Sequence, residues 1–302
     1  MAKLSIKEIQ FDGLAAVEIL TSKARLVAIT AMGPRIAFFG TRTGTRTGRN
    51  LLFWDYPRKY FRGKWFLMGG HRVWATRPMA DEPEESYADD NGPCTVRILK
   101  NGIDLQGPTH PVFRIRKSIG IRVHSDDTLV IENRITNESD MVWSGGVWAL
   151  TCTLPKARTS YGIPLGRQGE WDVFSVVIPK KWGGDNSTLV NDPALRYTED
   201  CLVIRPKGRI SKRMVQAPQG VIGMTDPTEK ISFIKQSNYE DQGRYPWNCN
   251  IAYYAAKKSF MLEMETMGPD QSVLPGGTIV SKETWMLRKP VDWGRLKGPF
   301  KD

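Results

Sequence analysis

A period-two alternation of apolar and polar residues constrains the fold of this chain more than any other feature. Ile119, Ile121 and Val123 alternate with more polar neighbours, so their side chains share one face of an extended strand. The Asn101-Gly102 dipeptide separates two short runs of the same kind, which is typical of a β-hairpin. No segment shows an amphipathic helical pattern of three turns. The pattern therefore predicts an all-β fold, a sandwich or a barrel.

The same pattern, bounded by Gly- and Pro-containing turns, recurs in other short runs. We expect strands over residues 15–21, 24–30, 35–40, 173–178, 201–205, 230–235, 251–256, 259–265 and 278–287. All-β units of more than about 200 residues commonly form one domain, and the composition does not shift along the 302 residues. The chain is therefore predicted to be a single domain over residues 1–302.

The net charge of +11, from 43 Lys and Arg against 32 Asp and Glu, suits either an anionic ligand or a solvated basic surface. No nucleic-acid-binding motif accompanies the charge, so we expect no nucleic-acid partner.

No 18-residue apolar run is present, so we expect no membrane span. The N-terminus lacks the apolar stretch of a secretory signal, and the four cysteines show no Cys-x-x-Cys pair. We expect a cytoplasmic protein with free thiols; a periplasmic location stays open if a leader was removed.

The segment 53–74 holds eight aromatic residues and the run Gly69-Gly70-His71-Arg72. Flat rings such as Trp74 suit the CH faces of sugars, although large aromatic residues also fill the core of a sandwich. His71 could act as a general acid near neutral pH. The three histidines have no ligand spacing, and the acidic residues 81, 89 and 90 are typical of a solvated loop, so no metal site is expected.

Glu263 and Glu265 are two residues apart on an expected strand, so they point to the same face. Two carboxylates among Phe and Met are costly to bury unless they are paired or used. Their mutual repulsion would raise one pKa, which suits acid–base chemistry. The alternative is an outward face that meets some of the many basic residues of this chain.

The segment 260–287 resembles the C-terminal signature of the aldose 1-epimerases. The matching residues are Phe260, Leu262-Glu263, Glu265, Pro269-Asp270, Leu274-Pro275-Gly276 and Glu283-Thr284-Trp285. Residues 68–74 resemble the Gly-Gly segment that lines the sugar cleft in the same superfamily, and residues 131–139 resemble its central strand and polar turn. The resemblance implies an antiparallel supersandwich of the galactose mutarotase-like type.

The resemblance also implies roles for individual residues. The glutamate of the Leu-Glu pair is the family's catalytic base, which places that role on Glu263. The family's acid is a histidine after the central segment, but residues 143–150 contain no histidine and Trp148 stands at about that position. His71 is the default replacement. The residues expected to contact the substrate are Arg72, Arg35, Trp74, Trp148, Glu265, Tyr245 and Trp247.

The expected function is anomer interconversion of a sugar or an acidic sugar, by an isomerase of the aldose 1-epimerase type that needs no cofactor. The expected partner is a small-molecule carbohydrate. Two alternatives stay open: carbohydrate binding without catalysis, and lyase or hydrolase chemistry in which Glu263 and Glu265 act as a pair. Fold alone does not decide among them.

Overall fold

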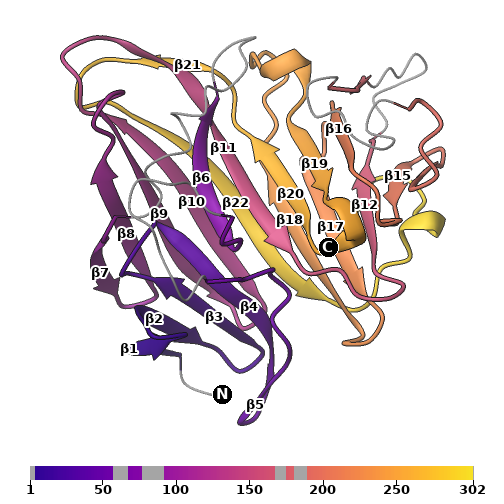
Figure 1. The fold of residues 1–302 in the computed structure, drawn as a ribbon, viewed down its shortest axis with the longest axis horizontal. Helices are drawn as coiled ribbons and strands as arrows, with labels where there is room; N and C mark the ends of the chain where they lie inside the picture. The colour runs from indigo at the N-terminus through magenta and orange to yellow at the C-terminus, as the bar shows by residue number, and fades with distance from the viewer. Residues whose placement is uncertain (1–3, 57–66, 77–91, 167–174, 180–188, 302) are drawn as a thin grey trace.

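The computed structural model describes residues 4–56, 67–76, 92–166, 175–179 and 189–301. These residues form two large antiparallel sheets, which confirms the predicted all-β sandwich. Figure 1 shows the indigo strands from the N-terminal part of the chain at one end of the molecule and the orange strands around β16 toward the other.

The twelve-stranded sheet combines strands that are consecutive in the sequence with strands that are far apart in it. In spatial order it contains β1 (Ser5–Phe11), β2 (Leu14–Leu20), β3 (Ala24–Ile29), β4 (Arg35–Thr43), β6 (His71–Thr76), β11 (Trp143–Thr153), β20 (Leu262–Met267), β19 (Ile251–Ala255), β16 (Ser211–Val215) and β13 (Val176–Val177). β5 (Arg46–Thr47) pairs with β4, and β21 (Gln271–Val273) pairs with β11.

The ten-stranded sheet covers one face of the first. In spatial order it contains β14 (Leu195–Tyr197), β15 (Cys201–Ile204), β12 (Ser160–Pro164), β17 (Val221–Asp226), β18 (Ile231–Ser237), β22 (Thr278–Arg288), β10 (Thr128–Asn137), β9 (Ile115–Ser125), β8 (Gly102–Thr109) and β7 (Thr95–Leu99).

The main hydrophobic core lies between the sheets and takes buried side chains from both. Phe39 of β4 packs against Phe233 of β18 and Trp285 of β22, with ring centroids 5.0 and 5.3 Å apart. Because one face of the twelve-stranded sheet is buried here, every second residue of its strands points to the opposite face, which we call the outer face.

Most of the expected strands are confirmed, with shifts at their ends. The strand expected over 259–265 begins only at Leu262, because Lys257–Ser259 form a 3-10 turn, η4, in which Lys258 and Ser259 have positive φ. The expected hairpin is present, but its two connecting residues are Lys100 and Asn101, and Gly102 already belongs to β8. A Cβ at Gly102 would lie 1.8 Å from the Ile121 carbonyl oxygen, so this glycine serves the close approach of β9.

Helical structure in the described residues is limited to 3-10 turns: η3 (Pro246–Asn248), η4 and η5 (Trp293–Arg295). None of it is a helix with the length and hydrophobicity to cross a bilayer.

The strands β6 and β11, at the centre of the twelve-stranded sheet, were not among the expected strands. Both are buried on their two faces over most of their length, so they lack the alternation that marks a half-buried strand.

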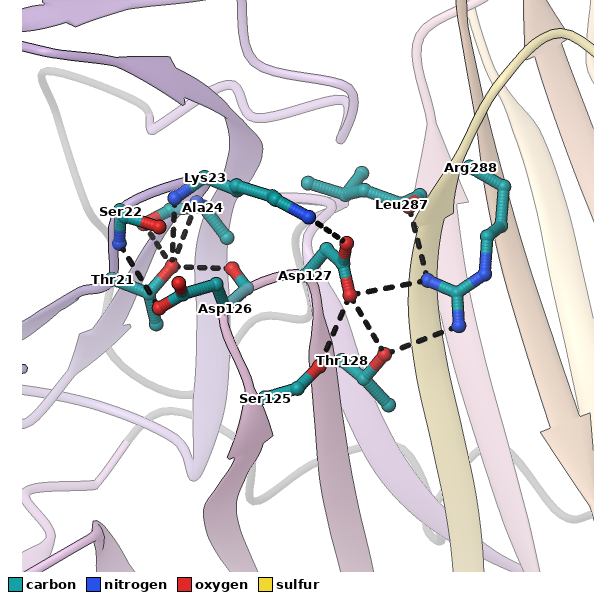
Figure 2. A network of polar contacts seen from close by, with 10 residues as sticks. All are labelled: Thr21, Ser22, Lys23, Ala24, Ser125, Asp126, Asp127, Thr128, Leu287 and Arg288. Carbon is teal, nitrogen blue, oxygen red and sulfur yellow. Dashed lines mark hydrogen bonds and ion pairs between the residues drawn. The ribbon is translucent and has the colours of Figure 1, made fainter. Parts of the chain in front are cut away.

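A polar network joins the two sheets at one edge (Figure 2). The turn between β2 and β3 brings Thr21 and Lys23 to the turn between β9 and β10: the Thr21 hydroxyl donates to the Asp126 carbonyl, and Lys23 Nζ lies 2.8 Å from Asp127. Arg288, at the end of β22, also contacts Asp127, at 3.3 Å. The network therefore fixes one sheet against the other.

Candidate functional site on the outer face

The central strands of the twelve-stranded sheet place charged and aromatic side chains on its outer face. On β6, Val73 points into the core, so Arg72 and Trp74 point outward. Trp148 of β11 lies beside Trp74, with ring centroids 5.9 Å apart in an edge-to-face arrangement. On β20, Leu262 and Met264 belong to the core, so Glu263 and Glu265 point outward together, as predicted from their spacing.

Arg72 and Glu263 form a buried ion pair across the intervening strand β11. Arg72 Nη2 lies 3.2 Å from Glu263 Oε1, and the two side chains are 1% and 9% exposed. The Arg72 guanidinium also stacks on the Trp74 ring, 4.3 Å from its centroid. The pair is therefore desolvated and fixed, so the remaining carboxylate oxygen of Glu263 has a defined direction.

Glu265 is held more tightly than Glu263. Lys212 Nζ of β16 lies 2.8 Å from both of its oxygens, and the Trp148 indole N–H donates to Oε2 at 3.0 Å. Burial raises the pKa of Glu265, Lys212 opposes this rise, and the neighbouring Glu263 adds to it. Both Glu265 oxygens are thus occupied by protein donors, which suits a structural or orienting role for this carboxylate.

Two further side chains of the outer face border Glu263. The Cys152 thiol of β11 donates to Glu263 Oε1 at 3.3 Å; burial, and next the charge of Glu263, raise the pKa of this thiol well above its usual value. Tyr254 of β19 pairs in register with Glu263, and burial followed by the charge of Glu263 raises the pKa of its phenol. Both groups therefore stay protonated beside the carboxylate at neutral pH.

The Gly-Gly turn before β6 allows a close approach of protein backbone. Gly69 and Gly70 have φ of 79° and 73°, and a Cβ on them would lie 2.2 Å from the Phe53 carbonyl oxygen and 2.3 Å from the Ile36 carbonyl oxygen. Arg35 of β4 holds this turn by donating from Nη1 to the Gly69 carbonyl at 2.6 Å. The structure thus shows Arg35, which is buried, bonded to the turn that begins β6.

His71 lies on the core side of β6, away from Glu263. Its Nδ1 is 2.8 Å from the Thr151 hydroxyl, its Nε2 is 2.9 Å from Asn133 Oδ1, and its ring packs edge-on against Trp285. The pKa of His71 is lowered to about 4, and burial is the largest cause of this shift. The structure therefore does not bring the expected acid and base together: adjacent residues of a strand point to opposite faces, and Arg72, not His71, reaches Glu263.

Tyr245 and Trp247 lie in and beside η3, before β19. Tyr245 is buried, stacks on Tyr239 and accepts a hydrogen bond from the Glu240 amide. The Trp247 side chain is 51% exposed, and its backbone has a positive φ of 56°. Among the described residues, no hydrogen bond or ring contact joins either residue to Glu263.

Sequence reasoning missed Lys212, Cys152 and Tyr254. None of them stands in a recognisable motif, and β16, which carries Lys212, was not among the expected strands. The only available signal was a general one, that two buried carboxylates need cationic partners. Several expected features cannot be placed: the aromatic residues 60, 61, 65 and 66 and the acidic residues 81, 89 and 90 lie outside the described residues.

The described part of the chain contains no group of three or more His, Cys, Asp or Glu side chains arranged to hold a metal ion. Cys152, Cys201 and Cys249 carry free, buried thiols. Mainly because of burial, the pKa of Cys201 and that of Cys249 are each raised to about 12.

The fold is similar to that of solved proteins of the galactose mutarotase-like class. A protein from Escherichia coli K12, provisionally assigned as an aldose 1-epimerase, superposes with a TM-score of 0.60 at 12% identity, over 95% of this chain and 100% of that chain. A Salmonella typhimurium protein, provisionally assigned as a mutarotase, gives 0.61 at 13% identity over 96% of each chain. A galactose mutarotase-like protein from Clostridium acetobutylicum gives 0.58 at 10% identity, over 95% of this chain and 99% of that one.

These similarities establish the fold. At 10–13% identity they do not transfer an activity, because one fold supports many functions. No protein-family model matches the sequence, and no curated protein matches it significantly. A functional conclusion therefore depends on the chemistry of the outer face.

Proposed function

We propose that this protein binds a carbohydrate on the outer face of its twelve-stranded sheet and interconverts its anomers. The site would consist of Arg72, Trp74, Trp148, Lys212, Glu263 and Glu265, which we call the outer-face cluster. The observation that supports the proposal most is the pairing of Arg72 with Glu263 beside two tryptophans. Aromatic faces beside fixed charged hydrogen-bonding groups suit a ligand with CH faces and hydroxyls.

In this proposal Glu263 accepts the proton of the anomeric hydroxyl. One oxygen of Glu263 is engaged by Arg72 and Cys152, so the other can accept from the sugar. Glu263 takes the O1 proton while a water molecule protonates the ring oxygen, so the bond between C1 and the ring oxygen breaks and the open-chain aldehyde forms. After rotation of the C1 carbonyl, the former ring oxygen attacks its other face and gives its proton to solvent, and Glu263 returns its proton to O1, which gives the other anomer. A positioned base contributes about 10²–10⁴-fold to such a step.

Glu265 would act as a positioning residue rather than as a second base. Lys212 and the Trp148 indole occupy its oxygens, which holds the Trp148 ring at the site. Lyase or hydrolase chemistry that needs two reacting carboxylates is less well supported, because Glu265 is fully buried.

A second candidate, carbohydrate binding without catalysis, is favoured by the placement of the histidines. The chain has three: His71 lies in the core, His110 is buried and bonded to the amides of its own turn, and His124 is exposed near the end of β9. A histidine acid would have to come from this set, and none of the three faces Glu263.

The test is exchange NMR spectroscopy of several neutral and acidic aldoses with the wild type and Glu263→Gln. We expect faster interconversion with the wild type and a loss of about 10²-fold or more in the variant. Glu18→Gln is the matched control, because Glu18 is also bonded to an arginine, Arg25, on the same sheet. Equal rates for wild type and Glu263→Gln, with sugar line broadening in both, would leave the binding function and reject the catalytic one.

A further inference from the structure

A second candidate binding site lies outside the outer-face cluster. Three connections line an open hollow of about 830 Å³: the segment after β11, the segment after β15 and the turn η4 before β20. None of the six residues of the outer-face cluster lines it. A hollow of this size matches a small-molecule site.

The hollow is lined by five cations and by no carboxylate among the described residues. The cations are Lys156, Arg158, Arg205, Lys207 and Lys258. All five are exposed, and no ion pair within the described part of the chain includes any of them. Five like charges around one concave surface raise the local potential and concentrate anions there.

Hydrogen bonds between and within these segments hold the walls of the hollow in place. The Ser259 hydroxyl accepts from the Gly208 amide at 2.8 Å, and the Lys258 amide donates to the Gly208 carbonyl at 2.7 Å. The Thr159 hydroxyl accepts from the Lys156 amide at 2.8 Å. These bonds fix the backbone from which the cationic side chains project, which removes part of the entropic cost of ordering the site around a ligand.

Three of the lining residues also have a left-handed backbone. Arg158, Lys258 and Ser259 have φ of 66°, 61° and 51°. Non-glycine residues in this conformation are uncommon and cluster at ligand-binding sites. Their position around the same hollow is an observation independent of its charge.

We propose that this hollow binds a compact polyanion with two or more adjacent phosphate or sulfate groups. Arginine and lysine together suit such groups, through forked and point-charge contacts respectively. Among the residues that the structure describes, the lining contains no aromatic side chain on which nucleic-acid bases could stack. A small molecule therefore fits the site better than a nucleic acid does.

The test is isothermal titration calorimetry of the full chain at low ionic strength, with inorganic tripolyphosphate, inorganic phosphate, a sulfated disaccharide and a short single-stranded RNA as probes. We expect one tripolyphosphate per chain, bound at least about tenfold more tightly than phosphate, with an affinity that falls as salt rises. The comparison of tripolyphosphate with the sulfated disaccharide identifies the phosphate or the sulfate source.

Arg205→Ala/Lys207→Ala should weaken tripolyphosphate binding by more than about tenfold, because a hydrogen bond to a charged group is worth about a factor of ten and the variant removes two cations that make such bonds. Lys100→Ala/Lys289→Ala removes the same charge from exposed positions elsewhere and should change binding by less than about twofold. Equal weakening by both double variants, several anions per chain, or tighter binding of RNA than of tripolyphosphate would overturn the proposal. Anomer interconversion should be unchanged in Arg205→Ala/Lys207→Ala, so this test is independent of the proposed function.

Discussion

Arg72 and Glu263 are 191 positions apart in the chain and meet on the outer face of the sheet, 3.2 Å apart. They belong to β6 and β20, which are separated by β11, so the pair spans three strands. Because both side chains are almost fully buried, each needs the other: a buried charge that loses its partner is costly.

We therefore expect Arg72→Gln to lower the free energy of unfolding by about 3 kcal/mol or more. The double variant Arg72→Gln/Glu263→Gln should recover part of this loss, because it leaves no uncompensated carboxylate. Urea denaturation of the wild type, both single variants and the double variant gives the coupling energy. Additive losses would show that the two side chains do not interact in solution.

A second buried ion pair, between Lys235 and Glu283, supports the site from the core side. Lys235 Nζ lies 3.0 Å from Glu283 and donates to the Met264 carbonyl, also at 3.0 Å. The pKa of Lys235 is lowered mainly by burial, and the charge of Glu283 opposes that shift. Met264 lies between Glu263 and Glu265, so this pair connects β18 and β22 to the strand that carries both carboxylates.

Lys235→Met should lower the free energy of unfolding by about 3–5 kcal/mol, because Glu283 would stay buried without its cation. The double variant Lys235→Met/Glu283→Gln should be more stable than Lys235→Met alone. Thermal and urea unfolding measure both. A double variant less stable than the single one would contradict the assignment of Glu283 as the uncompensated charge.

The burial of His71 predicts a pH dependence of stability. Its pKa is about 4 in the folded protein, with burial the main cause, against about 6.5 in the unfolded chain. Between these values the unfolded chain binds more protons than the folded one, so stability falls as the pH drops from about 6.5 to about 4. His71→Gln should lose less stability than the wild type over that range, measured by urea denaturation at several pH values. Parallel curves for the two proteins would show that His71 is not buried in its neutral form.

Asp104 gives a second pH dependence of stability, because its carboxylate is stabilised in the folded protein by neighbouring cations. Burial alone would raise its pKa, but hydrogen bonds from Arg97, Arg122 and Arg134 lower it to about 2. Its contribution is therefore present above the unfolded pKa of about 4 and is lost as the pH falls through about 2.

Asp104→Asn should lower the free energy of unfolding by about 2 kcal/mol at pH 7, the scale of hydrogen bonds to a charged group. The difference from the wild type should shrink as the pH falls from about 4 to about 2. Arg97→Gln is a milder control, because the Arg97 side chain is 74% exposed. A difference that does not change with pH would exclude the carboxylate charge as its cause.

The alternation of apolar and polar residues made many of the strands predictable from the sequence, but it gave no signal for strands that are buried on both faces. The alternation in β10 and β22 correctly predicts two strands, since each has one face in the core. β11 has nearly continuous burial and thus no such signal. The common direction of Glu263 and Glu265 follows from their spacing alone, and the structure places both on the outer face. Their different environments depend on Lys212, which is 51 residues away from Glu263 in the chain and whose strand was not expected.

His71 shows how a missed strand misplaces a residue. The Gly-Gly segment was interpreted as a ligand-lining run, so His71 and Arg72 were both expected in the site. Once residues 71–76 form a strand, only one of two adjacent side chains can face Glu263.

A sugar bound at the outer-face cluster would lie beside the Trp148 indole, which donates to Glu265, so this indole is a direct reporter of binding. The measurement is a ¹H–¹⁵N spectrum of the tryptophan indoles during titration with aldoses, with Trp148 assigned by Trp148→Phe. We expect saturating sugar to shift the Trp148 indole signal, while the signals of the buried Trp285 and Trp293 stay in place. A sugar that binds without moving the Trp148 signal, or a Trp148 signal that no aldose shifts, would contradict this expectation.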